Sequence, residues 1–166
     1  MLLWLVRHGI AVSRDDPQCP PDPLRPLSEK GRERMRDAAR GLRTLGVEPE
    51  LIVTSPYLRA LQTAEIISGT LQIAGCEIVE SATIEPLAKP QQLLDLLHRC
   101  ESNAVLCSGH APHLDRFLAF ITSDSAPFTS LKKGGTALVE LDRLEAGAGE
   151  LKWLQPPKVL RELGGN

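Results

Sequence analysis

The sequence predicts an α/β fold, specifically a three-layer αβα sandwich with a mostly parallel central sheet. The first observation is that short apolar runs alternate with longer amphipathic stretches in the order β-α-β-α-β-α-β-α. Such alternation is typical of parallel sheets covered by helices on both faces. The second is that 166 residues, 42% of them hydrophobic and 24% charged, suffice for one globular core. We therefore expect a single domain over residues 1–166.

The N-terminal element is predicted to be a buried strand, followed by a long helix. Leu2 to Val6 is short and apolar, and Gly9 follows it closely. Ser28 can cap a helix that runs to about Leu45, because the apolar residues between them recur at helical spacing. Gly46 then ends this helix.

A second strand and helix follow in the same order. Leu51 to Thr54 is predicted to be the strand. Pro56 stands where a first helical residue is favoured, with Thr54 and Ser55 as caps before it. The apolar stripe of this helix is Tyr57, Leu61, Ala64, Ile67 and Leu71.

The remaining elements continue the alternation and then change in character. We expect, in order, a strand at Glu77–Val79, a leucine-rich helix at Gln91–Cys100, a strand at Ala104–Cys107 and a helix at Pro112–Ile121. Thr136–Leu141 and Glu150–Leu154 are predicted to be two strands around a glycine-rich turn.

Basic side chains follow three of the predicted strands, at the edge of the sheet where ligands bind in such folds. Arg7 and His8 follow the first strand, Arg59 begins the helix after the second, and His110 follows the fourth. The planar fork of arginine suits phosphate, and helix N-termini add N–H groups and a positive dipole end. Gly9 would let the backbone approach the ligand closely. The pattern predicts a pocket for a dianion such as phosphate.

Composition excludes several other classes of function. A net charge of −2 argues against a general nucleic-acid binder, which usually needs a basic surplus. The apolar start lacks the pattern of a signal peptide, and no run approaches the ~18 residues of a membrane span. The four cysteines match no zinc spacing, so we expect reduced thiols in a cytoplasmic protein and no metal or other cofactor.

Three motifs in order resemble those of the histidine phosphatase superfamily, which has the phosphoglycerate mutase-like fold. They are R-H-G at 7–9, S-P-x-x-R-A-x-Q-T-A at 55–64 and G-H-x-P at 109–112. The segments D-P-L-R-P-L-S-E-K-G at 22–31 and L-K-K-G-G at 131–135 look most like those of SixA-type phosphohistidine phosphatases.

This resemblance implies roles for individual residues. His8 would be the nucleophile that takes the phosphoryl group, while Arg7, Arg59 and His110 would hold its oxygens. Arg25 would be a further phosphate contact, or equally an exposed arginine of the proline-rich loop.

Three further residues are less central to the predicted site. Glu85 falls near the position of the acid that protonates the leaving group in larger relatives, although it is equally readable as a loop glutamate before Pro86. His113 is predicted to be a rim or capping residue, and His98 a surface residue.

The length of one connection bears on the substrate that the resemblance implies. Larger relatives carry a lid after the third strand, whereas only 18 residues separate Glu85 from Ala104 here. An open rim suits phosphohistidine on a partner protein, whose imidazole leaves more easily than an alkoxide. A small-molecule phosphomonoesterase is the alternative, and a non-catalytic phosphate-binding module is a third possibility. Neither the partner nor the oligomeric state follows from the sequence.

Overall fold

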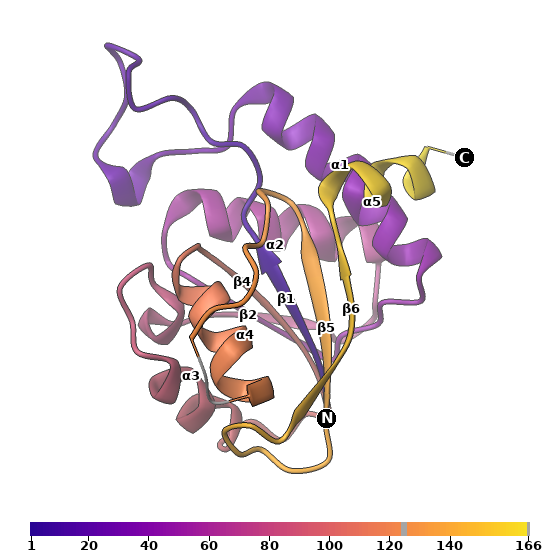
Figure 1. Ribbon diagram of the computed structural model, residues 1–166. Coiled ribbons are helices and arrows are strands. Elements are labelled where there is room, and N and C mark those ends of the chain that lie inside the picture. The colour runs from indigo at the N-terminus through magenta and orange to yellow at the C-terminus, as the bar shows by residue number, and fades with distance from the viewer. Residues whose placement is uncertain (124–125, 166) are drawn as a thin grey trace.

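One mixed sheet organises the molecule. The computed structural model describes residues 1–123 and 126–165, and six strands lie in the order β3-β2-β4-β1-β5-β6 (Figure 1). Their bounds are β1 Leu2–Arg7, β2 Leu51–Thr54, β3 Glu77–Glu80, β4 Ala104–Gly109, β5 Thr136–Leu141 and β6 Gly149–Gln155. β5 runs antiparallel to its neighbours β1 and β6, and the other strand pairs are parallel. The predicted α/β fold with a mostly parallel sheet is confirmed.

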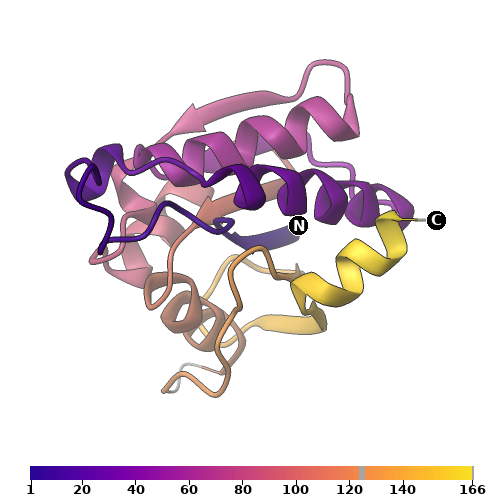
Figure 2. The ribbon, with the colours of Figure 1, turned by 90° about the horizontal axis from the view of Figure 1, so that it is seen from above.

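Helices cover both faces of the sheet, as Figure 2 shows from above. Their bounds are α1 Glu29–Thr44, α2 Leu58–Leu71, α3 Pro90–Leu97, α4 His113–Ser123 and α5 Pro157–Gly164. Helices α1, α2 and α5 pack on one face, and α3 and α4 pack on the other.

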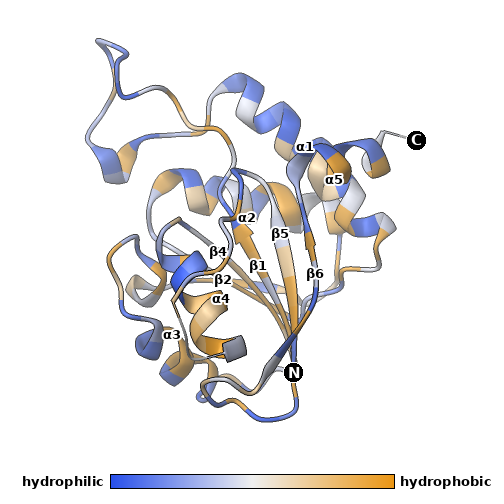
Figure 3. Cartoon of the chain, in the orientation of Figure 1, coloured by the Kyte–Doolittle hydropathy of each residue, from blue (hydrophilic) through white to orange (hydrophobic). Residues whose placement is uncertain are grey.

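The alternation of side chains along β1 feeds both layers of the core. Leu3 and Leu5 join the apolar cluster under α3 and α4, while Trp4 and Val6 join the cluster under α1 and α2. Figure 3 shows the consequence, since the central strands are almost continuously hydrophobic. Burial on both faces explains why the strand reads as an uninterrupted apolar run.

The structure corrects two of the predicted elements. Helix α2 begins at Leu58 rather than Pro56, and no side chain caps it at Tyr57. The Ser55 hydroxyl accepts a bond from the Tyr57 amide, but at 3.3 Å within a bend that turns toward the sheet edge. The sequence analysis also missed α5, a short helix that begins at the second of two consecutive prolines and buries only Leu160. The strands Leu51–Thr54 and Thr136–Leu141 have the predicted bounds, and the other boundaries shift by at most three residues.

Strand register decides what stands at the carboxyl edge of the sheet. In the parallel pairs, Arg7 lies opposite Gly109 and Thr54 opposite Ser108. The ladder continues past the strand ends, where the His8 amide donates to the Gly109 carbonyl at 2.9 Å and the Ser55 amide to the Ser108 carbonyl at 3.0 Å. The residues that follow β1, β2 and β4 are therefore brought together on rigid backbone.

A long loop between β1 and α1 stands over this edge. In Figure 1 it is the indigo segment that projects beyond the sheet, and it carries the 3₁₀ turn η1, Asp22–Leu24. An isolated bridge between Ala11 and Leu27 closes its base. The Leu27 amide also donates to Gln62 Oε1 on α2 at 2.8 Å, so the loop is anchored where it re-enters the fold.

Candidate active site

A cavity of about 450 Å³ opens at the carboxyl ends of β1, β2 and β4. Its lining residues come from the strand ends, the long loop and the segment before β5. They are Arg7, His8, Ser13, Arg14, Asp15, Asp22, Arg25, Arg59, Pro86, His110, Ala111 and Lys133. The structure thus brings together five of the residues predicted from the sequence: Arg7, His8, Arg25, Arg59 and His110. We call this space the histidine cavity.

His8 is held in one tautomer. Its Nδ1 lies 2.7 Å from the carbonyl of Gly9, and a carbonyl only accepts, so Nδ1 carries the proton. Nε2 then keeps its lone pair, which accepts a hydrogen bond from Arg59 Nε at 3.2 Å. Burial lowers the pKa of His8 to about 3, and the charges of Arg59, Arg7 and Lys133 act in the same direction. His8 is therefore neutral at physiological pH, with its free electron pair on Nε2.

Arg59 is buried and joined to the long loop. Its Nη1 donates to the Asp22 carbonyl at 2.7 Å, and its Nη2 lies 3.1 Å from the Asp22 carboxylate. Its guanidinium carbon also lies 5.0 Å from the centre of the Tyr57 ring, within cation–π range. These contacts aim the guanidinium at His8.

Cations outnumber anions around His8. Burial opposes ionisation of Asp22, but hydrogen bonds and charge from Arg14 and Arg59 lower its pKa overall. Burial and the neighbouring arginines lower the pKa of Lys133. Like charges packed this closely repel each other, so the cavity favours a dianion over a neutral guest.

His110 faces His8 across the cavity, with ring centroids 5.0 Å apart. Its Nε2 lies 2.9 Å from the Ser55 hydroxyl, and the Tyr57 ring packs edge-on against it at 5.1 Å. Burial, followed by the charges of His8 and Arg59, lowers its pKa to about 2. Its Nδ1 is buried and has no hydrogen-bond partner among the residues that the structure describes. A buried polar atom without a partner is costly, so this one calls for a functional explanation.

Arg7 and Arg25 complete the ring of cations. Arg7 Nη1 donates to the Leu131 carbonyl at 2.7 Å, which fixes the side chain against the segment before β5. Arg25 pairs with the Asp22 carboxylate at 3.1 Å and also donates to the Val12 carbonyl at 2.9 Å. Arg25 is thus an ordered part of the loop rather than an exposed arginine.

Comparisons with known proteins identify the family to which these motifs belong. Residues 3–84 match the model of the histidine phosphatase superfamily, branch 1. The phosphohistidine phosphatase SixA of Escherichia coli K12 is 29% identical over 97% of each chain. The chain belongs to the histidine phosphatase superfamily. It is a phosphatase.

Three further comparisons extend this assignment. An uncharacterized protein of Picosynechococcus sp. PCC 7002 is 34% identical, over 81% of this chain and 82% of the relative. The tungstate complex of the protein histidine phosphatase SixA has a TM-score of 0.84 at 26% identity, covering 96% of this chain and 99% of the other. The alpha-ribazole phosphatase of Shigella flexneri has the same fold at 15% identity, with a TM-score of 0.73 over 95% and 97% of the chains.

The surroundings of Gly9 differ from our expectation that it would let the backbone approach a ligand. Its amide donates to Thr63 Oγ1 at 3.1 Å, and a side chain at this position would meet Leu27 at 3.2 Å and the Gly31 carbonyl oxygen at 3.4 Å. Gly9 lines the neighbouring pocket but not the histidine cavity. Its small size suits the close approach of Leu27 and of Gly31 in α1, and its carbonyl orients His8.

Glu85 does not line the histidine cavity either, whereas the next residue, Pro86, does. Glu85 is half-buried and ends the 3₁₀ turn η2, Ala82–Ile84. The cavity carboxyl groups are Asp15 and Asp22, both on the long loop. The geometry therefore favours the interpretation of Glu85 as a loop residue.

The expectation for His113 is wrong, because the side chain is fully buried in the core rather than at the rim. It stacks on Phe117 of the same helix, with centroids 6.4 Å apart and the rings 13° from parallel. Burial lowers its pKa to about 4. His98 is exposed at the end of α3, as expected.

Sequence reasoning assigned no role in the site to Asp22, Lys133, Ser55 or Tyr57, although it placed Ser55 as a helix cap and Tyr57 on the apolar stripe of the helix. Two signals could have found the first pair. Asp22 and Arg25 are three residues apart in a proline-rich turn, which puts them on one face. Lys133 lies just before β5, and the start of an antiparallel strand stands at the carboxyl edge of its parallel neighbours.

The described residues also bear on metals, thiols and membranes. No three His, Cys, Asp or Glu side chains among residues 1–123 and 126–165 are grouped to hold a metal ion. The four cysteines are free thiols. Within the same part of the chain, every helix is too short or too polar to cross a membrane.

Proposed function

We propose that the protein removes the phosphoryl group from phosphohistidine on a signalling or phosphotransfer protein, through a covalent intermediate on His8. The observation that carries the proposal is the tautomer of His8. Its Nε2 is unprotonated and borders the histidine cavity, while its Nδ1 is tied to the Gly9 carbonyl. A neutral, oriented imidazole is a competent nucleophile toward phosphorus.

The proposed reaction has two steps. The Nε2 lone pair of His8 attacks phosphorus, and the bond from phosphorus to the substrate nitrogen breaks with its electrons passing to that nitrogen, which takes a proton from solvent. Water then attacks the phosphoryl group on His8, loses a proton and leaves as part of inorganic phosphate. His8 regains its lone pair for the next turnover.

The cations around His8 are proposed to stabilise both transition states. Arg7 and Arg59 offer guanidinium donors to the phosphoryl oxygens, and Arg25 offers a third from the loop. The unpartnered Nδ1 of His110 is a candidate donor to a phosphoryl oxygen, provided that it carries the proton. Side chains would thus supply the positive charge that metal ions supply in kinases, so activity should survive exhaustive EDTA treatment.

Two features favour phosphohistidine over a phosphate ester. First, the pKa of Asp22 is lowered, so this cavity carboxylate is ionised and unsuited to protonate an alkoxide. Second, α3, which follows η2, buries Leu93, Leu94 and Leu97 in the core under the sheet and so does not act as a lid. A leaving group that departs easily, presented on a protein surface, fits both features.

The alternative is a small-molecule phosphomonoesterase. The likeness in fold to the alpha-ribazole phosphatase favours it, because the same scaffold serves an enzyme named for a small phosphate ester. We also propose a cytoplasmic location, supported by the four free thiols.

One comparison of initial rates separates the two candidate functions. A phosphohistidine-bearing protein domain and a panel of alkyl and aryl phosphates are assayed with the same preparation. We expect the highest kcat/KM on the phosphohistidine domain, and rapid acid quench should trap base-stable, acid-labile label on the enzyme. Faster turnover of one phosphate ester would make the phosphomonoesterase the better assignment.

His8→Ala is the control for the chemistry. This variant should lose turnover and the trapped label while still binding vanadate, because the surrounding cations remain. Normal turnover by His8→Ala would overturn the assignment of the nucleophile.

A further inference from the structure

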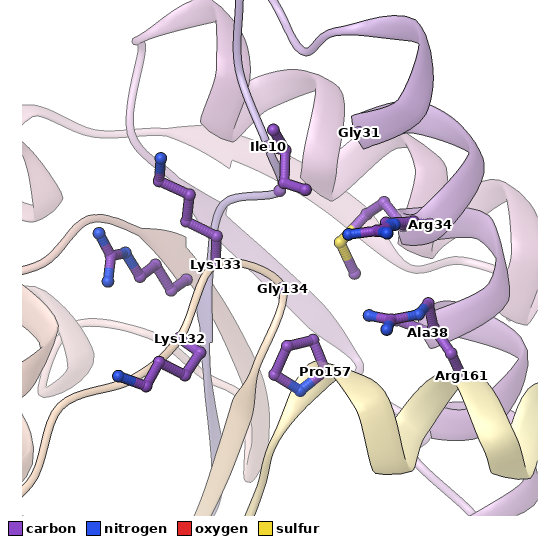
Figure 4. A pocket seen from close by; sticks show the side chains of 12 residues that line it. Ile10, Gly31, Arg34, Ala38, Lys132, Lys133, Gly134, Pro157 and Arg161 are labelled. Carbon is purple, nitrogen blue, oxygen red and sulfur yellow. The ribbon is translucent and has the colours of Figure 1, made fainter. Parts of the chain in front are cut away.

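A second pocket lies beside the histidine cavity, between α1, α5 and the segment before β5. It encloses about 460 Å³. Figure 4 shows Arg34 of α1 and Arg161 of α5 turning into it from one side, with Lys132 and Lys133 on the opposite wall. We call it the basic pocket. The resemblance to the histidine phosphatase superfamily assigned a catalytic role to none of these four residues.

The four cations of the basic pocket are unneutralised. Arg34, Lys132, Lys133 and Arg161 form no salt bridge with any residue in the described ranges 1–123 and 126–165. Other basic residues of α1, such as Arg40, do have an acidic partner. The lining residues include no aspartate or glutamate. Arg34 and Arg161 point into the pocket, while the Lys132 and Lys133 side chains extend from the opposite wall away from it (Figure 4). The two unpaired arginines, with the lysines nearby, create a local positive potential that complements an acidic guest.

The floor of the basic pocket is apolar. Pro157 of α5 and Ile10 supply its partly exposed apolar surface, and Met35 and Ala38 of α1 lie buried behind them. Gly134 forms part of the opposite wall with a φ of +80°, a conformation that favours glycine. An apolar floor under a cationic rim selects a guest that is itself both apolar and anionic.

The basic pocket and the histidine cavity share two wall residues, Arg7 and Lys133. A molecule that places a phosphoryl group on His8 therefore has the basic pocket directly beside it. A protein surface carries neighbouring side chains at a fixed separation from its phosphohistidine, whereas a free phosphoramidate carries none. The shared wall is the geometry required for recognition at two points.

We infer that the basic pocket binds an acidic and apolar segment of the phosphorylated partner protein, adjacent to its phosphohistidine. The inference rests on the proposed function and adds the chemistry by which a partner is selected. An aspartate or glutamate would pair with Arg34 and Arg161, and an aliphatic side chain beside it would cover Pro157. Selection of this kind acts on binding and leaves the chemical step unchanged.

Two synthetic peptides of equal length test the inference, each with one central phosphohistidine. One has Glu-Leu-Glu on its flank, and the other has Lys-Ser-Lys. We expect wild-type kcat/KM to be at least tenfold higher for the acidic peptide. In the double variant Arg34→Glu, Arg161→Glu, this preference should fall to within about twofold of unity, mainly through KM. Hydrolysis of free phosphohistidine should stay within about twofold of wild type.

Arg36→Glu is the matched control, because Arg36 is an exposed arginine of α1 outside the basic pocket. It should keep the preference, and the milder pair Arg34→Gln, Arg161→Gln should lose most of it. Circular dichroism melting confirms folding of each variant. Equal losses in Arg36→Glu and the double variant would mean that only overall charge matters, which overturns the inference.

The outcomes separate this inference from the proposed function. If wild type hydrolyses free phosphohistidine but treats both peptides alike, the inference fails and the proposed function stands. If wild type hydrolyses no phosphohistidine substrate, the proposed function fails. Competition by dodecanoate, abolished in the double variant and stronger than competition by the acidic peptide, would assign the pocket to a small amphiphilic anion and overturn the inference.

Discussion

Asp22 accepts two hydrogen bonds from Arg59. Its carbonyl oxygen lies 2.7 Å from Nη1, and its carboxylate lies 3.1 Å from Nη2. The third nitrogen of this guanidinium, Nε, donates a hydrogen bond to Nε2 of His8. Each of the three nitrogens of Arg59 thus has a partner within the protein. We expect a phosphoryl group to compete with the Asp22 carboxylate for Nη2, so that Asp22 lowers the affinity of the cavity for anions.

Asp22→Asn tests this competition. The substitution removes the negative charge but keeps the backbone carbonyl that holds Nη1, so Arg59 should stay in place. Vanadate should then inhibit about three- to tenfold more strongly, a change of at most ~1.4 kcal/mol, measured as its competitive inhibition constant. Asp16→Asn is the control, since Asp16 lies on the same loop outside the cavity. Weaker inhibition in Asp22→Asn would mean that the carboxylate is needed to orient Arg59.

Arg59→Ala and Arg25→Ala should differ in severity. Arg59 is buried and contacts His8 directly, so its loss should raise the barrier by ~2.7–4 kcal/mol, the range typical of one lost oxyanion donor. Arg25 contacts the loop and Asp22, and its loss should reduce kcat/KM by less than tenfold. The comparison uses kcat/KM on the phosphohistidine domain. Equal losses would place Arg25 against the phosphoryl group itself.

Glu85→Gln should leave hydrolysis of protein phosphohistidine within about tenfold of wild type, a change of at most ~1.4 kcal/mol. Glu85 is outside the lining of the histidine cavity, and imidazole needs little help to leave. The measurement is the ratio of rates for Glu85→Gln and wild type on phosphohistidine and on aryl phosphates. A hundredfold loss on phosphohistidine would show that an acid is needed and would favour the phosphomonoesterase.

His113 should make stability depend on pH between about 6.5 and 4. Its folded pKa, about 4, is lower than the ordinary value of 6.5, so the unfolded chain binds more protons in this window. Stability therefore falls as pH falls, by up to ~1.4 kcal/mol per pH unit for this side chain. His113→Leu should flatten the slope measured by urea unfolding from pH 7 to 4.5, and leave turnover at pH 7 intact. An unchanged slope would contradict the assignment.

Gly41→Ala should destabilise the packing of α5 on α1. An added methyl group would lie 1.9 Å from the Leu160 carbonyl oxygen, which is backbone and cannot turn away. We expect a loss of ~1–3 kcal/mol, measured by urea unfolding. Gly69→Ala is the control with the opposite sign, because nothing lies within 4 Å of that position and alanine favours the helix by about 0.5–1 kcal/mol. Equal stability of the two variants would refute the close approach.

The positions of the strand-end residues were predictable because parallel strands place their carboxyl ends at the same edge of the sheet. Once Leu2–Val6 and Ala104–Cys107 are assigned as strands of one sheet, His8 and His110 must meet at its edge. The contribution of Asp22 was not predictable, since it depends on the path of a sixteen-residue loop, 12–27, that no periodicity encodes. Helix α5 was missed for a different reason: it is amphipathic but only eight residues long, which is too short for a periodic pattern to be recognised with assurance. Because α5 forms part of the basic pocket, the pocket could not be predicted from the sequence either.

The sheet edge and the loop supply different side chains to the cavity, and this has a consequence for engineering. His8 and His110 lie on backbone that continues the strand ladder, so both side chains are held with the rigidity of the sheet. The loop delivers Arg14, Asp22 and Arg25, and its two ends are joined at the Ala11–Leu27 bridge. A loop whose two ends lie close together can be exchanged for another loop without moving the elements that it connects. Exchanging residues 12–26 for a loop of another length or charge, with Asp22 retained as the partner of Arg59, should direct the enzyme to other phosphorylated molecules while His8 keeps its position.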